Sequence, residues 1–315
     1  MKPTGMIDLH CDTLTTKTPC TGEYADTLDC PTNQIALSKI PKGTKWAQLF
    51  AIFIPDDKRG QAAIDYFDYY KESFYALAEH HKDCFTPCRS FKDIKRTFDE
   101  KKFGGILTVE GGCVLAGQLE RVRSIADAGV KLLTLVWNGE NEIGSGHDTT
   151  KGLTDFGKEV IPELEKNNII IDTSHLNDKG FEDLFKIAKK PFVASHSNAR
   201  AIASHKRNLK DEFIEEIIKR QGLIGLNYHM PFLSDNESTA SFDDILRHTT
   251  YFLEKGAEGC LALGSDYDGS TISDCLNSVE KAFSLYDYFI AHGIPERTAD
   301  NIMFGNAYGF FERNL

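Results

Sequence analysis

The sequence predicts an α/β fold in one domain, a (β/α)8 TIM barrel that spans residues 1–315. Short apolar runs alternate with longer amphipathic segments, and the runs are nearly continuous, which is typical of parallel strands covered on both faces. A doubly wound sheet is the alternative, but it requires a glycine-rich turn after the first strand, and "HCDTLTT" (10–16) contains no glycine. Eight strands that are each followed by a helix therefore favour the barrel.

The expected strands cover, in chain order, residues 5–10, 47–54, 104–110, 131–137, 168–175, 191–196, 222–228 and 260–266. The expected helices show helical spacing of apolar residues and cover 61–81, 90–101, 117–128, 155–167, 178–189, 209–221, 241–256 and 276–292. Thr154 and Asn177 are suitable N-caps for two of them, and Pro162 predicts a kink or a restart within 155–167. Two long stretches, 15–46 and 138–153, follow the first and fourth strands. In a barrel, such loops build the face on which active sites lie.

Composition and charge exclude several classes of function. The net charge of −11 argues against non-specific nucleic-acid binding, because no basic face is available for phosphates. No apolar run approaches the roughly 20 residues that span a bilayer, so we expect no membrane segment. The helical stripe over 66–77 is expected to face the core, and a homodimer patch is the alternative.

The eight cysteines are scattered and contain no CxxC pair, which predicts free thiols in a reducing compartment. The few residues before the first apolar run leave no room for a signal peptide, and the last residues, "YGFFERNL", contain no hydrophobic tail for a lipid anchor. We therefore expect a cytoplasmic protein.

Polar residues end five of the expected strands, and all can bind a divalent metal: His10, Asp12, Glu110, His175, His196 and Asp266. The carboxyl ends of barrel strands share one rim, so this pattern predicts that the six side chains converge. Three histidines and three carboxylates suit Zn²⁺, with Mn²⁺, Co²⁺ or Fe²⁺ as alternatives. Six ligands exceed the need of one catalytic zinc, so two metals bridged by a carboxylate such as Glu110 fit better.

Each residue also has an ordinary structural explanation. His10 alone is more often a hydrogen-bonded histidine than a ligand, and Asp12 could cap the following turn. Asp268 is an alternative to Asp266 as the functional residue at the end of the last strand, and either aspartate could instead be a helix cap. Asp172 or Ser174 could orient the ring of His175. It is the whole set of strand ends that favours the metal site, and Cys11, which points away from His10 and Asp12 on a strand, is expected to pack in the core.

Several stretches taken together resemble the renal (membrane) dipeptidase family of metal-dependent, amidohydrolase-like barrels. They are "DLHCDTL" (8–14), "TVEGG" (108–112), "GLTDFGKEVIPELEKNNIIIDTSHLND" (152–178), "PFVASHSNARAIASHKRNL" (191–209) and "LGSDYDG" (263–269). The resemblance covers nearly the whole chain and implies a metallodipeptidase with two Zn²⁺, in which a metal-bridging hydroxide attacks the peptide bond of a dipeptide.

The resemblance also implies a role for each matching residue. His10 and Asp12 would bind one metal, His175 and His196 the other, and Glu110 would bridge them. Asp266 would take the proton of the attacking hydroxide and deliver it to the leaving amine. Arg207 would hold the C-terminal carboxylate of the substrate, for which a guanidinium is a suitable partner, whereas the residues alone favour a solvated charge. A D-residue at the C-terminal position of the substrate is a further expectation from the family.

One departure from the family concerns the substrate contacts. Trp137 stands where many members carry a histidine that polarises the scissile carbonyl. Asn138 or His147 could replace this histidine, although His147 is expected to be a surface-loop residue. Tyr228, beyond the seventh strand, is a candidate for the pocket wall, with a core tyrosine as the alternative.

Two other functions remain open from the sequence. One is another binuclear amidohydrolase, acting on a lactone, a cyclic amide or a phosphotriester. Several such enzymes bridge their metals with a carboxylated lysine at the end of strand four, but Lys131 begins that strand. The other is a non-catalytic metal- or peptide-binding barrel, which would have no use for Asp266.

Overall fold

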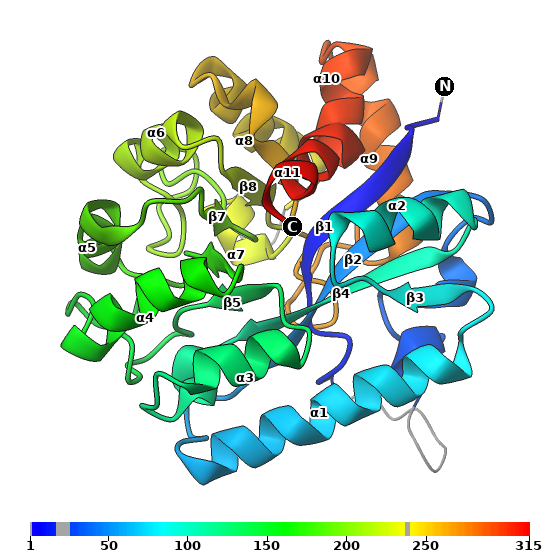
Figure 1. The fold of residues 1–315 in the computed structure, drawn as a ribbon. Helices are drawn as coiled ribbons and strands as arrows, with labels where there is room; N and C mark the ends of the chain where they lie inside the picture. The colour runs from blue at the N-terminus through cyan, green and yellow to red at the C-terminus, as the bar shows by residue number, and fades with distance from the viewer. Residues whose placement is uncertain (1, 17–25, 237–239) are drawn as a thin grey trace.

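The computed structural model of the chain describes residues 2–16, 26–236 and 240–315, and it contains a closed parallel barrel (Figure 1). The strands are β1 (Gly5–Cys11), β2 (Lys45–Phe53), β3 (Phe85–Pro87), β4 (Phe103–Glu110), β5 (Leu132–Thr134), β6 (Ile170–Asp172), β7 (Val193–Ala194), β8 (Leu223–Leu226) and β9 (Leu261–Leu263). Around the barrel the order is β1-β2-β4-β5-β6-β7-β8-β9, and β9 pairs again with β1. The predicted (β/α)8 barrel is therefore confirmed.

Helices surround the strands (Figure 1). They are α1 (Gln61–His80), α2 (Phe91–Asp99), α3 (Arg121–Asp127), α4 (Asp155–Lys166), α5 (Asp178–Ile187), α6 (Asp211–Lys219), α7 (Met230–Leu233), α8 (Phe242–Glu254), α9 (Val279–Ala291), α10 (Glu296–Asp300) and α11 (Asn306–Asn314). Thr154 and Asn177 are the N-caps of α4 and α5, accepting hydrogen bonds from Gly157 N and Gly180 N. The predicted restart at Pro162 is wrong, since α4 continues through it.

The structure differs from the expected pattern in two places. Strand β3 was not expected; it pairs with Phe103–Gly105 at the start of β4, before β5 joins β4 at Thr108. The expectation that a helix follows every strand is wrong for β1, because the described part of its connection holds only short 3₁₀ turns at Thr27–Asp29 and Leu37–Lys39. Both features come from short segments without enough repeats to show a period.

The end of the chain closes the amino end of the barrel, which the sequence did not predict. Phe304, Phe310 and Phe311 are buried in one cluster with the first residues of the strands, among them Leu132 and Leu223. Helix α11 accordingly lies beside the barrel strands in Figure 1. The opposite, carboxyl end of the strands is left for the functional residues.

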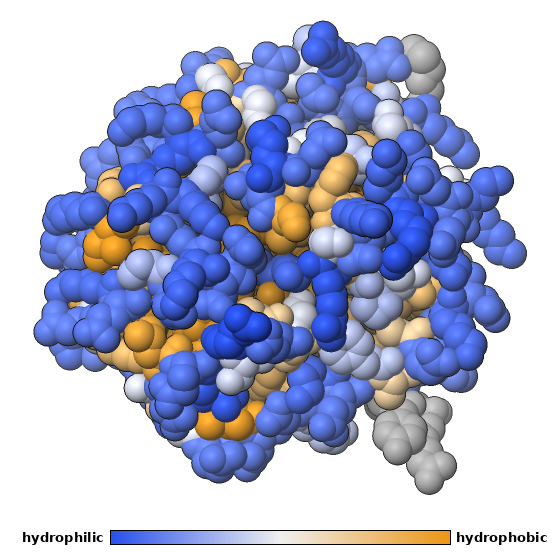
Figure 2. All heavy atoms as spheres, viewed as in Figure 1, coloured by the Kyte–Doolittle hydropathy of each residue, from blue (hydrophilic) through white to orange (hydrophobic). Residues whose placement is uncertain are grey.

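The surface is mainly hydrophilic on the face drawn in Figure 2, with smaller apolar patches between helices. Helix α1 buries Phe67 and Phe74, as expected for the stripe over 66–77, but Tyr69 on the same helix is 67% exposed. Within the described ranges, no helix is both long enough and apolar enough to cross a membrane.

Cys30 is joined in a disulfide, so the prediction that the cysteines are free thiols is wrong for this residue. Cys20 lies outside the described residues. The other six are free: Cys11, Cys84, Cys88, Cys113, Cys260 and Cys275. A disulfide depends on how the fold brings two backbones together, and the spacing of cysteines along the chain does not contain that information. Cys11 is fully buried in the core, as expected.

Candidate metal centre and its cavity

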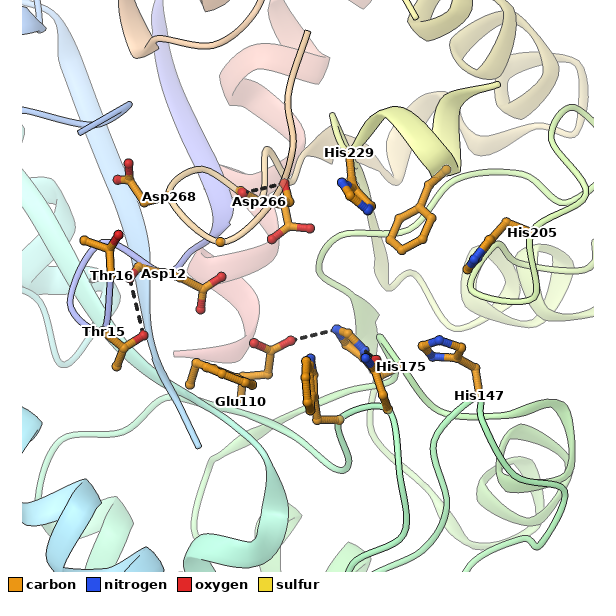
Figure 3. Close-up of a pocket in the computed structure, with 16 residues that line it drawn as sticks. Asp12, Thr15, Thr16, Glu110, His147, His175, His205, His229, Asp266 and Asp268 are labelled. Atoms are coloured by element: carbon orange, nitrogen blue, oxygen red, sulfur yellow. Dashed lines mark hydrogen bonds and ion pairs between the residues drawn. The ribbon is translucent and has the colours of Figure 1, made fainter. Parts of the chain in front are cut away.

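The residues predicted to bind metal lie together at the carboxyl end of the barrel, and Figure 3 shows Asp12, Glu110 and His175 among them. His10 is the second-to-last residue of β1 and Asp12 directly follows the strand, while Glu110 ends β4 and His175 and His196 follow β6 and β7. The register of β1 is irregular between Asp8 and Cys11, which includes His10. An irregularity of this kind re-aims a side chain at the end of a strand.

Glu110 occupies the middle of this group. One of its oxygens, Oε1, lies 2.8 Å from His175 Nε2 and 3.5 Å from His196 Nε2, and the other, Oε2, lies 3.7 Å from His10 Nε2. The Nε2 atoms of His175 and His196 are 3.1 Å apart, and His10 Nε2 is 3.4 Å from Asp12 Oδ2. Two overlapping groups could each hold a metal ion: His10–Glu110–His196 and His10–Asp12–Asp266. Within each group, one donor atom of every residue lies within 4.8 Å of the others. Glu110 is thus placed to contact both halves of the cluster.

Buried polar atoms without partners show that the cluster fits a divalent cation. Both ring nitrogens of His10 and Oδ1 of Asp12 are buried and lack a hydrogen-bond partner among the described residues. A buried polar atom without a partner costs roughly 1–3 kcal/mol, so such atoms are rarely left in this condition. Imidazole nitrogens and carboxylate oxygens are common ligands of zinc. The donor chemistry therefore suits a metal of that class.

The electrostatics differ between the two halves of the cluster. Burial raises the pKa of Glu110 well above its usual value, because a carboxylate loses its hydration there. Burial alone would lower the pKa of His10, but the charges of Glu110 and Asp12 outweigh it and raise this pKa to about 10. Burial, with cationic neighbours, lowers the pKa values of His175 and His196 well below the usual value. The two imidazoles are therefore neutral, as ligands must be.

Hydrogen bonds orient the ligand histidines. His196 Nδ1 lies 2.7 Å from Ser195 Oγ, which donates to Asp172 Oδ2 at 2.6 Å. Because the single hydroxyl proton of Ser195 is directed to the carboxylate, its oxygen accepts from His196 Nδ1–H, and the lone pair of His196 is on Nε2, facing Glu110. His175 Nδ1 similarly meets Asn138 Oδ1 at 2.9 Å. The expectation that Asp172 or Ser174 orients His175 is therefore wrong: Asn138 does so, and Asp172 acts on His196.

Asp266 and Asp268 have different roles. Asp266 Oδ2 accepts a hydrogen bond from Asn227 Nδ2 at 3.1 Å, and burial raises the Asp266 pKa to about 6. Asp268 instead accepts from Gln34 N and Thr13 Oγ1, both at 2.6 Å, and so fixes the long first connection to the loop after β9. Both aspartates have left-handed φ angles, 64° and 65°, which are uncommon outside glycine. Asp266 therefore faces the cluster, while Asp268 holds the loop that carries it.

A cavity of about 460 Å³ opens over the cluster. Trp137 and Asn138, two of the residues proposed to contact substrate, line it, and Phe53 packs edge-to-face on Trp137 with 4.8 Å between ring centroids. His147 also lines it with a side chain only 13% exposed, so the expectation of a surface-loop histidine is wrong. Gly146 explains this position, because its Cα approaches the carbonyls of Trp137 and Asn138 so closely that a Cβ would lie 1.9 Å from Trp137 O.

The sequence did not single out His205, His229 and Phe232, which also line the cavity; His205 and His229 lie across from Asp12 and Glu110 in Figure 3. Both histidine rings lie against Phe232, with centroids 4.7 and 4.6 Å away. All three follow β7 or β8, where barrel loops carry functional residues. Their position in the loops after these strands is the feature of the sequence that could have identified them.

Arg207 and Tyr228, the other predicted substrate contacts, are not in the cavity wall. Arg207 is 4% exposed; its Nη1 donates to Ser197 Oγ, its Nη2 to His196 O, and its guanidinium lies 5.6 Å over the ring of Phe232. Its Nε has no partner among the described residues. The solvated charge favoured by the residues alone is thus excluded. Tyr228 is fully buried beside Tyr267, so the core alternative is correct and the predicted wall position is wrong.

Comparisons with known proteins agree with this geometry. The family model described as membrane dipeptidase (peptidase family M19) matches residues 1–313. An uncharacterized protein in the pqqA 5′ region of Klebsiella pneumoniae is 32% identical over 230 residues, which are 70% of this chain and 85% of that protein.

Two crystal structures are similar over almost the entire chain. A metallo peptidase from Rhodobacter sphaeroides, liganded with a phosphinate mimic of the dipeptide L-Ala-D-Ala, has a TM-score of 0.92 at 25% identity and covers 99% of this chain and 100% of its own. A dipeptidase described as a family M19 metallo peptidase has a TM-score of 0.92 at 26% identity, with 99% of both chains covered.

Proposed function

Because the chain belongs to the membrane dipeptidase family of metallopeptidases, we propose that it is a zinc-dependent dipeptidase with two metal ions. The supporting observation is the convergence of His10, Asp12, Glu110, His175 and His196 beneath a cavity large enough for a small peptide. His10 and Asp12 would hold one ion, His175 and His196 the other, with Glu110 between them. Ions bound there would supply a Lewis acid for the scissile carbonyl and lower the pKa of a water molecule toward neutrality.

Asp266 is the proposed proton carrier. Its Oδ2 is held by Asn227, which leaves Oδ1 to take a proton from the attacking water and to deliver it to the leaving amine. A pKa of about 6 keeps the carboxylate ionised at neutral pH and close enough to neutrality for both transfers.

Arg207 is proposed to bind the free C-terminal carboxylate of the dipeptide. Its buried Nε–H lacks a partner, and its charge lies behind Phe232 in the wall. A carboxylate is the expected partner for a guanidinium, and the cavity volume limits the substrate to a few residues. The similar Rhodobacter sphaeroides structure holds a mimic of L-Ala-D-Ala, which supports our proposal that a D-residue is accepted at the C-terminal position.

Kinetics on dipeptides with metal analysis tests this function. We expect hydrolysis of L-Ala-D-Ala, loss of activity after chelation, and recovery with Zn²⁺. Glu110→Ala should reduce kcat/KM by at least about 10³-fold, while Glu163→Ala, on the surface of α4 beside Lys166, should not change it. Full activity of Glu110→Ala would contradict the shared role of Glu110. Preference for a lactone or a phosphotriester over every dipeptide would favour another amidohydrolase activity.

A further inference from the structure

A second cavity of about 340 Å³ adjoins the first on the same face of the barrel. It lies between the loop over 147–150, the start of α5 and the loop over 200–206. The ring of His147 lines both cavities, and its centroid is 6.0 Å from that of His175. A substrate that spans the metal cluster therefore has a polar chamber within reach, on the side of His147.

Most acceptors in this chamber are already engaged. Asp178 receives both terminal nitrogens of Arg200, at 2.9 and 2.8 Å, and Lys210 Nζ at 2.8 Å. Glu182 is paired with Lys179 at 3.1 Å. Asp148 Oδ1 lies 3.6 Å from His147 Nε2, and the side chain of Asp148 is 62% exposed.

The donors, in contrast, are available. His147 Nδ1 and Thr149 Oγ1 are buried and have no hydrogen-bond partner among the described residues. Lys206 forms no ion pair with a carboxylate among the described residues. Its positive charge and that of Arg207 both act on the ring of His147. A chamber with free donors and a free cation is complementary to an anion.

We propose that this chamber is a specificity subsite for the side chain of the substrate's C-terminal residue, and that it selects the anionic side chains of aspartate and glutamate. The inference rests on the proposed dipeptidase function, in which Arg207 holds the adjoining carboxylate. Lys206 lines the chamber and directly precedes Arg207 in the chain, and it is the cation that would pair with the anionic side chain. Thr149 and His147 supply the neutral hydrogen bonds.

The test compares Ala-Asp with Ala-Asn and Ala-Glu with Ala-Gln, pairs that differ in charge but hardly in size. We expect the wild-type kcat/KM to favour the acidic member about 10-fold. Lys206→Met should reduce this preference about five-fold, and Thr149→Val about three-fold. Both effects are smaller than the whole preference because solvent screens charges at the open side of the chamber. Lys219→Met, on α6 and paired with Glu216, is the matched control and should leave all four rates unchanged.

Calorimetry of the same dipeptides with chelated protein gives a second readout that needs no turnover. Tighter binding of Ala-Asp than of Ala-Asn, weakened in Lys206→Met, supports the subsite even if hydrolysis of dipeptides fails. Turnover of neutral dipeptides without a charge preference, or a preference that Lys206→Met leaves intact, overturns the subsite while the dipeptidase function stands.

Discussion

We predict that Asp172 controls the affinity of His196 for a metal ion, although Asp172 is not itself among the proposed ligands. Its carboxylate accepts four hydrogen bonds, from Thr134 Oγ1, Ser174 N, Ser195 N and Ser195 Oγ, at distances of 2.6–3.1 Å. Replacing it with asparagine keeps the acceptor for the two backbone N–H groups but turns the other oxygen into an NH₂ donor. Ser195 Oγ would then accept from this amide and direct its own proton to His196 Nδ1. The imidazole would then adopt the tautomer with its proton on Nε2, the nitrogen whose lone pair is needed to bind the metal.

The size of this effect follows from the bonds that change. Each hydrogen bond to a buried charged group contributes about 1.5–3 kcal/mol, and two of the four are replaced by weaker neutral ones. We therefore expect Asp172→Asn to lower the free energy of unfolding by about 2 kcal/mol. Loss of such an indirect partner typically weakens metal binding about 10–100-fold.

Chelator competition on purified protein measures the affinity of each metal equivalent, and denaturant unfolding measures stability. One of the two equivalents should weaken in Asp172→Asn. Ser195→Ala is the matched variant, because it removes the same relay from His196 while leaving the charge of Asp172. The reasoning is refuted if Asp172→Asn is folded and retains both metals with affinities within two-fold of wild type.

Three further predictions concern other parts of the site. In Gly269→Ala, the new Cβ would lie 1.9 Å from Asp12 Oδ2, so the carboxylate must move by about 1 Å; we expect about a 10²-fold loss of kcat/KM with normal far-UV circular dichroism, and near-normal kinetics would contradict it. Gln34→Ala removes the acceptor 2.6 Å from Asp268 N and should lower kcat about five-fold without changing KM, as steady-state kinetics would show. Asn138→Ala removes the partner of His175 Nδ1 and should weaken one metal equivalent about ten-fold in chelator competition, whereas unchanged affinity would exclude an orienting role.

The convergence of the proposed metal ligands could be predicted from the sequence because regular geometry determines their positions. Parallel strands carry whatever follows their last apolar residue to one rim, so Glu110, His175 and His196 could be brought together without knowledge of the loops. The same reasoning separated His10 and Asp12 from Cys11, which is buried in the core.

Residues in long loops could not be placed in this way. His147 enters the cavity because the chain turns sharply at Gly146, and His205 and His229 because their rings pack on Phe232. These are tertiary contacts without a period in the sequence. The barrel-closing segment was missed for a related reason: the glycines at 305 and 309 weaken the helical pattern, and burial of Phe310 in the barrel end outweighs this propensity.

The two sides of the site are supported by the same arrangement of side chains. Asp172 on β6 binds the backbone N–H and the hydroxyl of Ser195, and Asp8 on β1 binds the backbone N–H, at 2.9 Å, and the hydroxyl of Ser265. In each case the residue after the serine acts in the site: His196 in the first, Asp266 in the second.

A buried aspartate on one strand thus fixes the backbone just after a neighbouring strand, and this backbone in turn positions the functional side chain that follows. These carboxylates are fully buried and saturated with donors, so they resist movement, whereas the chamber beside His147 is built from loop residues with unused donors. Changes in that loop can therefore alter which dipeptide is accepted without disturbing the atoms that hold the metals. It follows that specificity should respond to single substitutions at Thr149 or Lys206, while metal affinity should respond to substitutions in the proposed ligands and in the residues that orient them, which are the buried aspartate–serine pairs and Asn138.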